Sequence, residues 1–427
     1  VNNYRLIFTT PKFGFLVQLK LVNNNQLIPL PSLRFALSNL WEVLYCALSL
    51  QNPGLSSDDI LSLPLVELVK KLKEDTLSPD VVLYTYMEKA LTVTKEVNCV
   101  RHFIPECEPF LQQLKNQKEK GLLYGVPVSI KDHIAYKGHL TTCGFSHFLD
   151  VEEEDSVLVK VLKKQGANPF VFTNVPQSLF NYDCSNVVFG QTVNPFDHKR
   201  TPGGSSGGEG ALIAGGGSIL GFGSDLGGSI HLPSSFCGLC GLKPTTGRLS
   251  STPLRIGYYD TDGYFLLPPC MRRAVHKTRK LLQEAGHTVC IFAATVYCTT
   301  YLHVKYLSSL DFVRTLMTIA VWAQVYQKKF IEHWKKDKLD VVLCPVLGPA
   351  FFLGYPSKIL AAVSNTMLYN GLNFPAGVVP VTTVTEADEE ELAQHRGIYG
   401  DYWDRILKQV CMNSGEVLQK CLWINNI

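Results

Sequence analysis

The sequence lacks long runs of charge of one sign. Lys and Arg together number 40 and Asp and Glu 37 in 427 residues, so the formal net charge is only +3. The densest charged stretch, residues 152–155, is shorter than the runs of like charge that mark a basic arm or an acidic tail. A charge-driven association with nucleic acid is therefore excluded, and no nucleic-acid partner is expected.

Long hydrophobic runs are missing as well. In the first 50 residues, Pro29, Pro31, Arg34 and Glu42 interrupt the apolar stretches before any reaches the roughly 18 residues of a membrane-spanning helix. The sequence therefore predicts neither a signal peptide nor a clear transmembrane helix. We expect residues 1–51 to form an irregular leader or the remnant of a membrane anchor.

Cysteine is present, but a disulfide or zinc pattern is not. Thirteen cysteines, an odd number without regular spacing, are typical of reduced thiols in a large intracellular protein. The one CxxC element, Cys237 to Cys240, has no second pair or HxxxH partner nearby. It predicts two buried structural thiols, and neither a metal nor another cofactor is expected.

What the chain does contain is the composition and the periodicity of a globular α/β protein. Hydrophobic residues make up 46% of the sequence, which excludes a disordered chain. Ser78 followed by Pro79 predicts a helix that runs to about Thr94. A helix, a glycine and a strand then follow one another twice, at 157–173 and at 271–292, with later strands at 340–344 and 377–383.

This recurrence predicts an α/β sheet that helices cover on both faces. Residues 52–427 are expected to form one large domain. Within it, Val126 to Ile130 alternates like a short strand, and Lys131 follows with the opposite side-chain direction to Ile130. The strand therefore ends on a lysine, which can act as a base if burial lowers its pKa.

Glycine is concentrated in one tract. Twelve of the 33 glycines lie within residues 203–228, where Glu209 and Asp225 are the only charged side chains. Such a tract allows the backbone to approach another group closely. A phosphate-binding loop would need GxxxxGK[ST] or a GxGxxG after a strand, and neither is present. A merely structural glycine loop is less favoured, because the tract is long and contains two GGS elements.

Two serine chemistries remain for this tract. Residues 204–208 match the GxSxG pattern of an esterase with Ser206 as nucleophile, but a polar loop rather than an apolar strand precedes them. Alternatively, Ser229 follows Leu226, Gly227 and Gly228, whose backbone N–H groups can converge on an oxyanion. In that arrangement the nucleophile and the oxyanion hole belong to one segment.

Three segments together resemble the amidase signature family, and within it the branch that hydrolyses fatty acyl amides. They are residues 124–131, 202–210 and 223–230, and further likeness lies at 173–180, 236–244, 256–259 and 373–384. The resemblance covers roughly residues 51–415. It implies a single large amidase-signature domain whose mixed, twisted sheet is covered by helices on both faces.

The resemblance also implies a Ser-Ser-Lys triad for acyl transfer. Ser229 would be the nucleophile that carries the acyl group, Ser205 the proton relay and Lys131 the general base and acid. The substrate-binding residues implied in this way are Leu179, Phe180, Ser205, Leu226, Gly227, Gly228 and Ser229, of which Leu179 and Phe180 would line the acyl pocket and residues 226–229 would form the oxyanion hole.

The substrates implied by the resemblance are fatty acyl amides, including N-acylethanolamines and primary amides such as oleamide, which are cleaved to fatty acid and amine. The same likeness implies a homodimer that is associated with endomembranes, such as the endoplasmic reticulum, on their cytosolic face. No cofactor is implied.

The chain departs from the family pattern at several places. His231 stands where the family has Arg, which predicts altered local hydrogen bonds and a different pH optimum. The resemblance implies deletions near residue 250 and at 296–310, and residues 412–427 are expected to lack the family's closing strand and helix. The alternative hypothesis is therefore a truncated, catalytically impaired relative that only binds a ligand or a partner.

Overall fold

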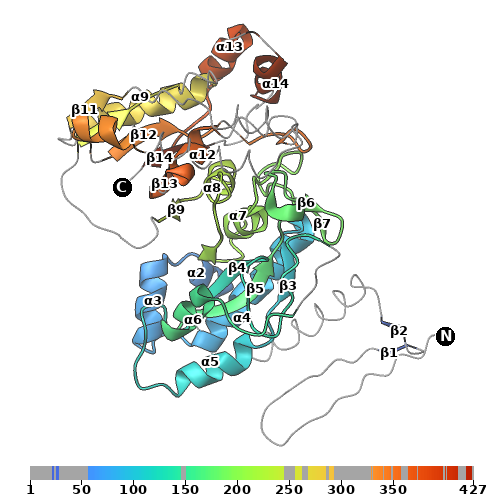
Figure 1. The fold of residues 1–427 in the computed structure, drawn as a ribbon. Helices are drawn as coiled ribbons and strands as arrows, with labels where there is room; N and C mark the ends of the chain where they lie inside the picture. Colours follow the sequence, from blue (N-terminus) through green and yellow to red (C-terminus); the bar gives the residue numbers. More distant parts are fainter. Residues whose placement is uncertain are drawn as a thin grey trace, which may run out of the picture. The chain divides into compact units, whose positions relative to one another are not determined.

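The computed structural model describes most of the chain beyond residue 55 (Figure 1). The described residues are 22–23, 26–27, 56–145, 151–244, 255–261, 268–284, 288–292, 328, 330–339, 341–347, 350–356, 364–372, 374–397, 400, 402–411 and 420–425. They divide into two compact units, Val1–Ser62 and Leu63–Ile427. The first contains the pair of short strands β1 (Val22–Asn23) and β2 (Gln26–Leu27) and the helix α2 (Ser57–Leu61).

The first half of the second unit is built on a four-stranded mixed sheet. Its strands lie in the order β3 (Val100–Phe103), β5 (Asn168–Thr173), β4 (Pro127–Lys131) and β8 (Gly221–Phe222). Strand β4 runs parallel to β5 and β8, and β3 runs antiparallel to β5. Every residue of β4 and β5 is buried, as expected for parallel strands that are covered on both faces.

Opposite faces of this sheet meet different helices. On one face Ile130 and Phe172 share a hydrophobic cluster with Val159 of α6 (Val157–Lys164). On the other face Ser129 and Thr173 bond to α7 (Gly207–Ala214) through Glu209. The remaining helices around the sheet are α3 (Leu65–Lys73), α4 (Pro79–Val97) and α5 (Cys107–Lys115).

The second half contains a six-stranded mixed sheet. Its order is β11 (Thr288–Ile291), β10 (Arg255–Tyr258), β12 (Val341–Pro345), β14 (Lys420–Asn425), β13 (Ala376–Thr383) and β9 (Gly241–Lys243). The helices of this half are α8 (His231–Phe236), α9 (Pro269–Glu284), α12 (Ser364–Gly371), α13 (Glu386–Gln394) and α14 (Tyr402–Cys411). Ten of the described strands thus belong to these two mixed sheets, while β1 with β2, and β6 (Ser185–Asn186) with β7 (Gly190–Gln191), form separate two-stranded sheets. The α/β class predicted from the sequence is confirmed.

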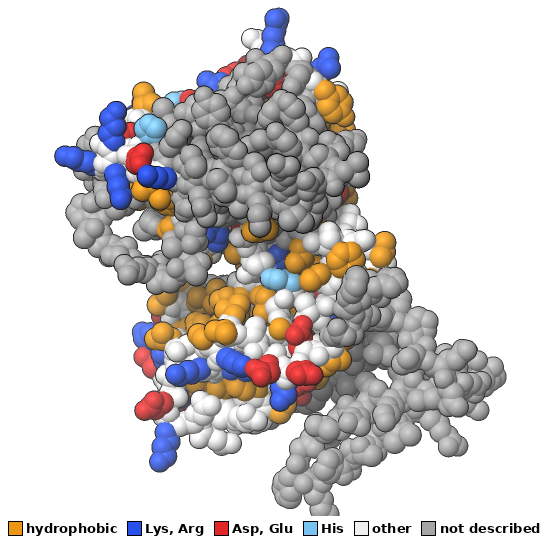
Figure 2. Space-filling model, in the orientation of Figure 1, with side chains coloured by type: hydrophobic (Ala, Val, Ile, Leu, Met, Phe, Trp, Pro, Cys, Tyr) orange, Lys and Arg blue, Asp and Glu red, His pale blue; other side chains and the backbone are white. Residues whose placement is uncertain are grey.

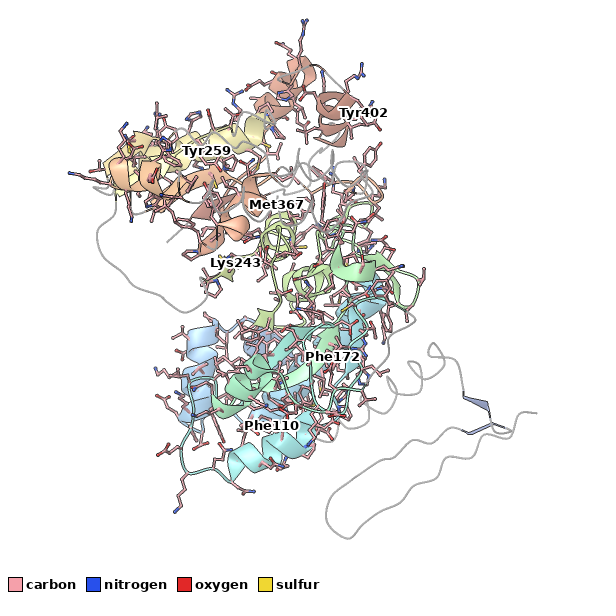
Figure 3. All side chains as sticks on the ribbon, in the orientation of Figure 1. Phe110, Phe172, Lys243, Tyr259, Met367 and Tyr402 are labelled. Atoms are coloured by element: carbon pink, nitrogen blue, oxygen red, sulfur yellow. The ribbon has the colours of Figure 1, made fainter. Side chains whose placement is uncertain are left out.

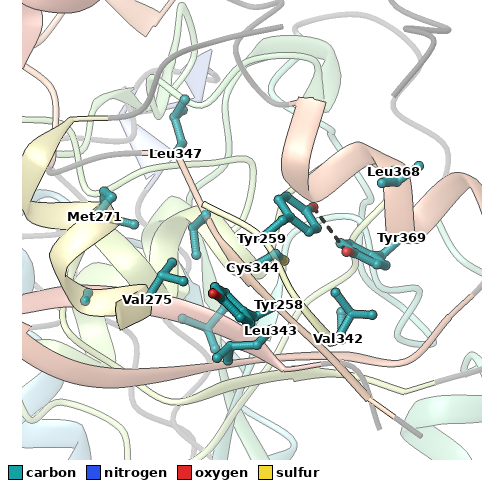
Figure 4. Packing of buried hydrophobic residues seen from close by; sticks show 14 of the residues in the cluster. Tyr258, Tyr259, Met271, Val275, Val342, Leu343, Cys344, Leu347, Leu368 and Tyr369 are labelled. Carbon is teal, nitrogen blue, oxygen red and sulfur yellow. Dashed lines mark hydrogen bonds between the residues drawn. The ribbon is translucent and has the colours of Figure 1, made fainter. Parts of the chain in front are cut away.

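The core of this half packs α9 and α12 against the strands. Met271 and Val275 of α9 lie in the same hydrophobic cluster as Val342 and Leu343 of β12 (Figure 4). Tyr369 of α12 reaches this core as well, and its hydroxyl donates to the hydroxyl of Tyr259 at 3.1 Å. A polar contact between two buried hydroxyls satisfies both of them where water is excluded.

Most of the local predictions are confirmed. Helix α4 follows Ser78 and continues to Val97, three residues past the predicted end, where Asn98 adopts a left-handed conformation with φ 54°. Ser156 caps α6 by accepting a bond from Val159 N–H, and Gly166 ends the turn with φ +81°. The surface in Figure 2 carries Lys and Arg interspersed with Asp and Glu, with hydrophobic side chains between them, in keeping with the near-neutral charge.

One strand was not expected and one prediction is wrong. Residues 420–425 form β14 between β12 and β13, where their backbone completes the hydrogen bonding of both neighbours, while the loss of the family's closing strand and helix stays a prediction. Cys237 is buried but Cys240 is exposed, because Gly238, with φ +67°, turns the chain out of α8 toward the edge strand β9.

Other expectations lie outside the described residues. These are the leader at residues 1–51, apart from β1 and β2, and the apparent deletions near 250 and at 296–310. The expected domain boundary after residue 51 stays a prediction, while the two compact units divide after Ser62. Among the described helices, none has both the length and the apolar character that crossing a bilayer requires.

Candidate active site

Three polar side chains from distant segments meet at the carboxyl end of β4. The Lys131 amino group donates to the Ser205 hydroxyl at 2.7 Å, and the Ser205 hydroxyl donates to Ser229 Oγ at 2.8 Å. Lys131 and Ser205 are buried, and Ser229 is half-buried. The result is a continuous hydrogen-bonded path from a buried amine to a serine that solvent can reach.

The strand places Lys131 by simple alternation. Ile130 points into the hydrophobic cluster under α6, so the next side chain must point to the α7 side of the sheet. Ser205 and Ser206 lie immediately before α7, which packs closely on that side. The Cβ that an alanine would carry at Gly208 would lie 2.4 Å from the backbone nitrogen of Asn174, so only glycine allows this approach.

Burial determines the proton affinity of Lys131. Desolvation lowers its pKa from 10.5 to about 8, although the nearby carboxylates of Asp225 and Glu209 partly offset this effect by favouring the charged form. The carbonyl oxygen and the hydroxyl of Ser224 lie 3.4 and 3.3 Å from the amine and accept its remaining hydrogens. A lysine in this state supplies a substantial fraction of neutral amine near physiological pH.

A second buried ionisable group, Glu209, lies on the same side of the sheet. Its carboxylate accepts bonds from Ser129 at 2.6 Å and from Thr173 at 2.8 Å. Burial raises its pKa to about 7, although these two hydroxyls and the charge of Lys131 act in the opposite direction. Sequence reasoning noted this glutamate only as one of two charges in the glycine tract.

The turn before Ser229 presents backbone donors. Among the described residues, no acceptor faces the N–H groups of Leu226, Gly227 or Ser229. The Gly228 N–H differs from the expectation for the oxyanion hole, because it donates to Asp225 Oδ1 at 2.6 Å. Three of the four expected donors are therefore available to an oxyanion in this conformation.

The two residues expected to line the acyl pocket lie beside another loop. Leu179 ends the short 3-10 helix η1 (Gln177–Leu179), and Phe180 follows it. The Ser178 N–H in η1 donates to the carbonyl of Cys143 at 2.9 Å. Phe180 is 70% exposed, so its ring lies at the surface rather than in a closed pocket. Their role in binding the acyl chain stays a prediction.

The geometry disfavours the esterase alternative. Ser206 is buried, and its hydroxyl has no hydrogen-bond partner among the described residues. Its backbone N–H donates to the Ser229 carbonyl at 3.1 Å. This bond holds the segment that contains Ser206 against the segment that contains Ser229. No base in the described part of the chain lies within hydrogen-bond distance of the Ser206 hydroxyl, so nothing there can take its proton. The described residues also contain no group of three His, Cys, Asp or Glu side chains placed to hold a metal ion.

Comparison with known proteins also indicates an amidase. A family described as Amidase matches residues 81–254. Fatty-acid amide hydrolase 1 of Sus scrofa is 38% identical over 482 residues, an alignment that covers 86% of this chain and 83% of that protein. The chain belongs to the amidase signature family. Membership of this family makes it an amide-hydrolysing enzyme.

Two more relatives of this amidase extend the comparison. Fatty acid amide hydrolase 1 of Caenorhabditis elegans is 32% identical over 480 residues and covers 84% of each chain. Vitamin D3 hydroxylase-associated protein of Gallus gallus is 55% identical over 303 residues, which are 57% of this chain. The alignment covers 65% of that avian protein, so the amidase spans slightly less than two thirds of its length.

Solved structures share the fold of this amidase. A structure of fatty acid amide hydrolase matches with a TM-score of 0.73 at 21% identity, covering 87% of this chain and 82% of the other. A 6-aminohexanoate cyclic dimer hydrolase matches with a TM-score of 0.64 at 18% identity, covering 84% and 97%. The single large α/β architecture of the family is therefore confirmed for this chain.

Proposed function

We propose that this amidase hydrolyses fatty acyl amides to a fatty acid and an amine, with Ser229 as the acylated nucleophile. The observation that carries the proposal is the hydrogen-bonded path from Lys131 through Ser205 to Ser229, with steps of 2.7 and 2.8 Å. A serine hydroxyl needs a base to remove its proton, and this path connects it to an amine whose pKa is about 8.

In the proposed acylation step, Ser229 Oγ attacks the amide carbonyl carbon. Its proton passes to Ser205, whose own proton passes to neutral Lys131. The carbonyl oxygen becomes an oxyanion that the N–H groups of Leu226, Gly227 and Ser229 stabilise. The protonated lysine then returns a proton through Ser205 to the leaving nitrogen, because an amine anion is a very poor leaving group. In deacylation, water attacks the acyl carbon and gives its proton through Ser205 to Lys131. The Ser229 oxygen leaves, receives a proton back by the same path, and the fatty acid is released.

The names of the aligned relatives support the proposed substrate class. Two of them, each 32% or more identical over at least 83% of their own length, are fatty acid amide hydrolases. An Acetamidase of Emericella nidulans is also 38% identical, but the alignment covers only 52% of this chain. Fatty acyl amides, among them N-acylethanolamines and oleamide, are therefore the first substrates to test, and acetamide is the comparison.

The test uses a fluorophosphonate probe, which phosphonylates activated serines, beside hydrolysis of oleamide, an N-acylethanolamine and acetamide. We expect the parent chain to be labelled and to prefer the long-chain amides. Ser229→Ala and Lys131→Ala are expected to lose both activities, and Ser206→Ala to keep them. A parent chain that is neither labelled nor active would favour the impaired relative that only binds ligands, and a loss confined to Ser206→Ala would favour the esterase.

Membrane association and a homodimer stay proposals from the family resemblance. Sedimentation with phospholipid vesicles tests the first, and light scattering of the purified chain tests the second. Recovery of a monomer that stays in the supernatant would contradict both.

A further inference from the structure

Asp225, four residues before the nucleophile, is the centre of a dense hydrogen-bond network. Its side chain is fully buried and lies at the start of the turn 225–229. Oδ1 accepts from the Gly228 N–H at 2.6 Å, and Oδ2 accepts from the N–H groups of Ile230 at 2.5 Å and His231 at 3.0 Å. The residues on both sides of Ser229 are thus bonded to one carboxylate.

Two side chains complete the shell around this carboxylate. His231 Nδ1 lies 2.6 Å from Oδ2, and the Asn370 amide donates to Oδ1 at 2.5 Å. Five donors converge on two oxygen atoms that offer about four lone-pair sites, so the hydrogen-bonding capacity of the carboxylate is filled. Although burial raises the pKa of Asp225, the bonds from His231 and from the backbone outweigh it and lower the pKa to about 2. The carboxylate therefore stays ionised throughout the neutral range.

Helix α12 holds the turn from a second side. The Thr366 hydroxyl donates to the Gly227 carbonyl at 2.9 Å. At Gly228, where φ is +134°, a Cβ would lie 2.9 Å from the same hydroxyl. Met367, labelled in Figure 3, places its Cε 3.5 Å from the position that a Cβ on Gly227 would occupy. Helix α12 and the 226–229 turn are thus about 140 residues apart in the sequence.

Among the described residues, Asp225 is the one hydrogen-bond partner of the His231 imidazole. Its side chain is fully buried, and Nε2 has no hydrogen-bond partner among the described residues. A buried polar atom without a partner is unfavourable for stability. Packing alone is therefore a poor explanation for a histidine at this position. The bond from its ring to Asp225 is the contact that would be needed to hold the turn in place.

We propose that Asp225, His231 and Asn370 are positioning residues that fix the 226–229 turn, so that its three N–H groups without an acceptor in the described part of the chain point at the oxyanion site beside Ser229. The inference rests on the proposed function, because it assigns the turn to stabilising the oxyanion. Binding of the ground-state amide does not require this alignment, whereas stabilising the oxyanion does. Loss of the network is expected to lower kcat and leave KM nearly unchanged.

The test measures the rate of fluorophosphonate labelling and the kcat and KM for oleamide in matched variants. Asn370→Asp keeps the volume of the side chain but replaces the donor by an acceptor facing Asp225. His231→Ala removes the ring, and His231→Asn supplies an amide donor of similar reach to Nδ1. We expect Asn370→Asp and His231→Ala to lose about 10- to 100-fold in kcat and in labelling rate, with His231→Asn recovering part of the loss.

The control is Asn365→Ala on the same helix. Asn365 is fully buried, and neither of its amide atoms has a partner among the described residues, so this change removes a buried asparagine without touching Asp225. Its kcat is expected to match the parent. An equal loss in Asn365→Ala, a change in KM alone, or no recovery in His231→Asn while its melting temperature equals that of the parent would overturn the positioning role.

The two proposals fail in different ways. In the labelling reaction, a phosphonyl group takes the place of the amide carbonyl, and its oxygen also needs the oxyanion donors. The labelling rate therefore reports on the 226–229 turn whatever the natural substrate is. A parent that is labelled but hydrolyses no fatty acyl amide would overturn the substrate class, while the labelling rates of the variants still decide the positioning role. A parent with neither activity would overturn both.

Discussion

At the residue scale, the proposed role of Lys131 as the base predicts how the rate of hydrolysis depends on pH. The base must be neutral, and burial lowers its pKa from 10.5 to about 8. We expect kcat/KM to rise with pH, about tenfold per unit well below pH 8, and to level off above it. Measuring kcat/KM for oleamide from pH 6 to 10 checks this. A rise centred near 10.5 would mean that the lysine is not desolvated.

Glu209 is the second residue whose protonation the fold changes. Burial raises its pKa from 4.5 to about 7, so the folded state binds more protons than the unfolded state between these values. Stability is therefore lost as pH rises through this window, by about 3 kcal/mol for a shift of this size. In Glu209→Gln we expect this loss to disappear, with a smaller difference in melting temperature between pH 5 and pH 8.

The same substitution has an effect on activity. Because the Glu209 carboxylate raises the pKa of Lys131, its removal is expected to move the midpoint of the kcat/KM profile below that of the parent. A midpoint that moves upward would contradict the electrostatic coupling of the two groups.

At the scale of elements, the contact between α7 and the residue that directly follows β5 positions Ser205. Gly208 of α7 meets the backbone of Asn174, with the ideal Cβ only 2.4 Å from the nitrogen and 2.5 Å from the carbonyl oxygen. Alanine is the better helix former by about 1 kcal/mol, but backbone atoms cannot yield as a flexible side chain can. We expect Gly208→Ala to destabilise the fold by about 1–3 kcal/mol and to slow labelling of Ser229. Urea unfolding and labelling rates measure the two effects, and an unchanged or raised midpoint of unfolding would show that the helix can move away freely.

At the scale of the whole molecule, β14 determines whether the second sheet is continuous. It pairs antiparallel with β12 on one side and with β13 on the other. Removal of residues 420–427 would leave two unpaired strand edges in the interior of the six-stranded sheet, where their N–H and C=O groups lose their partners. We expect loss of cooperative unfolding and of labelling, because α12 and its contact with the 226–229 turn depend on this half. Removal of 426–427 alone is the control, and full activity of the shorter chain without β14 would contradict this account.

The sequence alone determined the local features and predicted the chemistry of the site. Alternation across 126–131 predicted that Lys131 would point away from the apolar side, and the glycine density of 203–228 predicted close backbone approach. Both depend on neighbouring residues only, through the two-residue period of a strand and the missing Cβ of glycine. The family resemblance then assigned roles to Lys131, Ser205 and Ser229, and the fold and the amide-hydrolysing class that it implies are confirmed.

Only the tertiary structure brought distant segments together. The contact of Asn370 with Asp225 joins residues 145 positions apart, and no periodicity or motif encodes such a pairing. The burial that lowers the pKa of Lys131 and raises that of Glu209 arises from the packing of α7 on the sheet, because desolvation depends on everything that surrounds a charge. Strand β14 was missed for the same reason, since a short apolar run becomes a strand only when two neighbouring strands offer it partners.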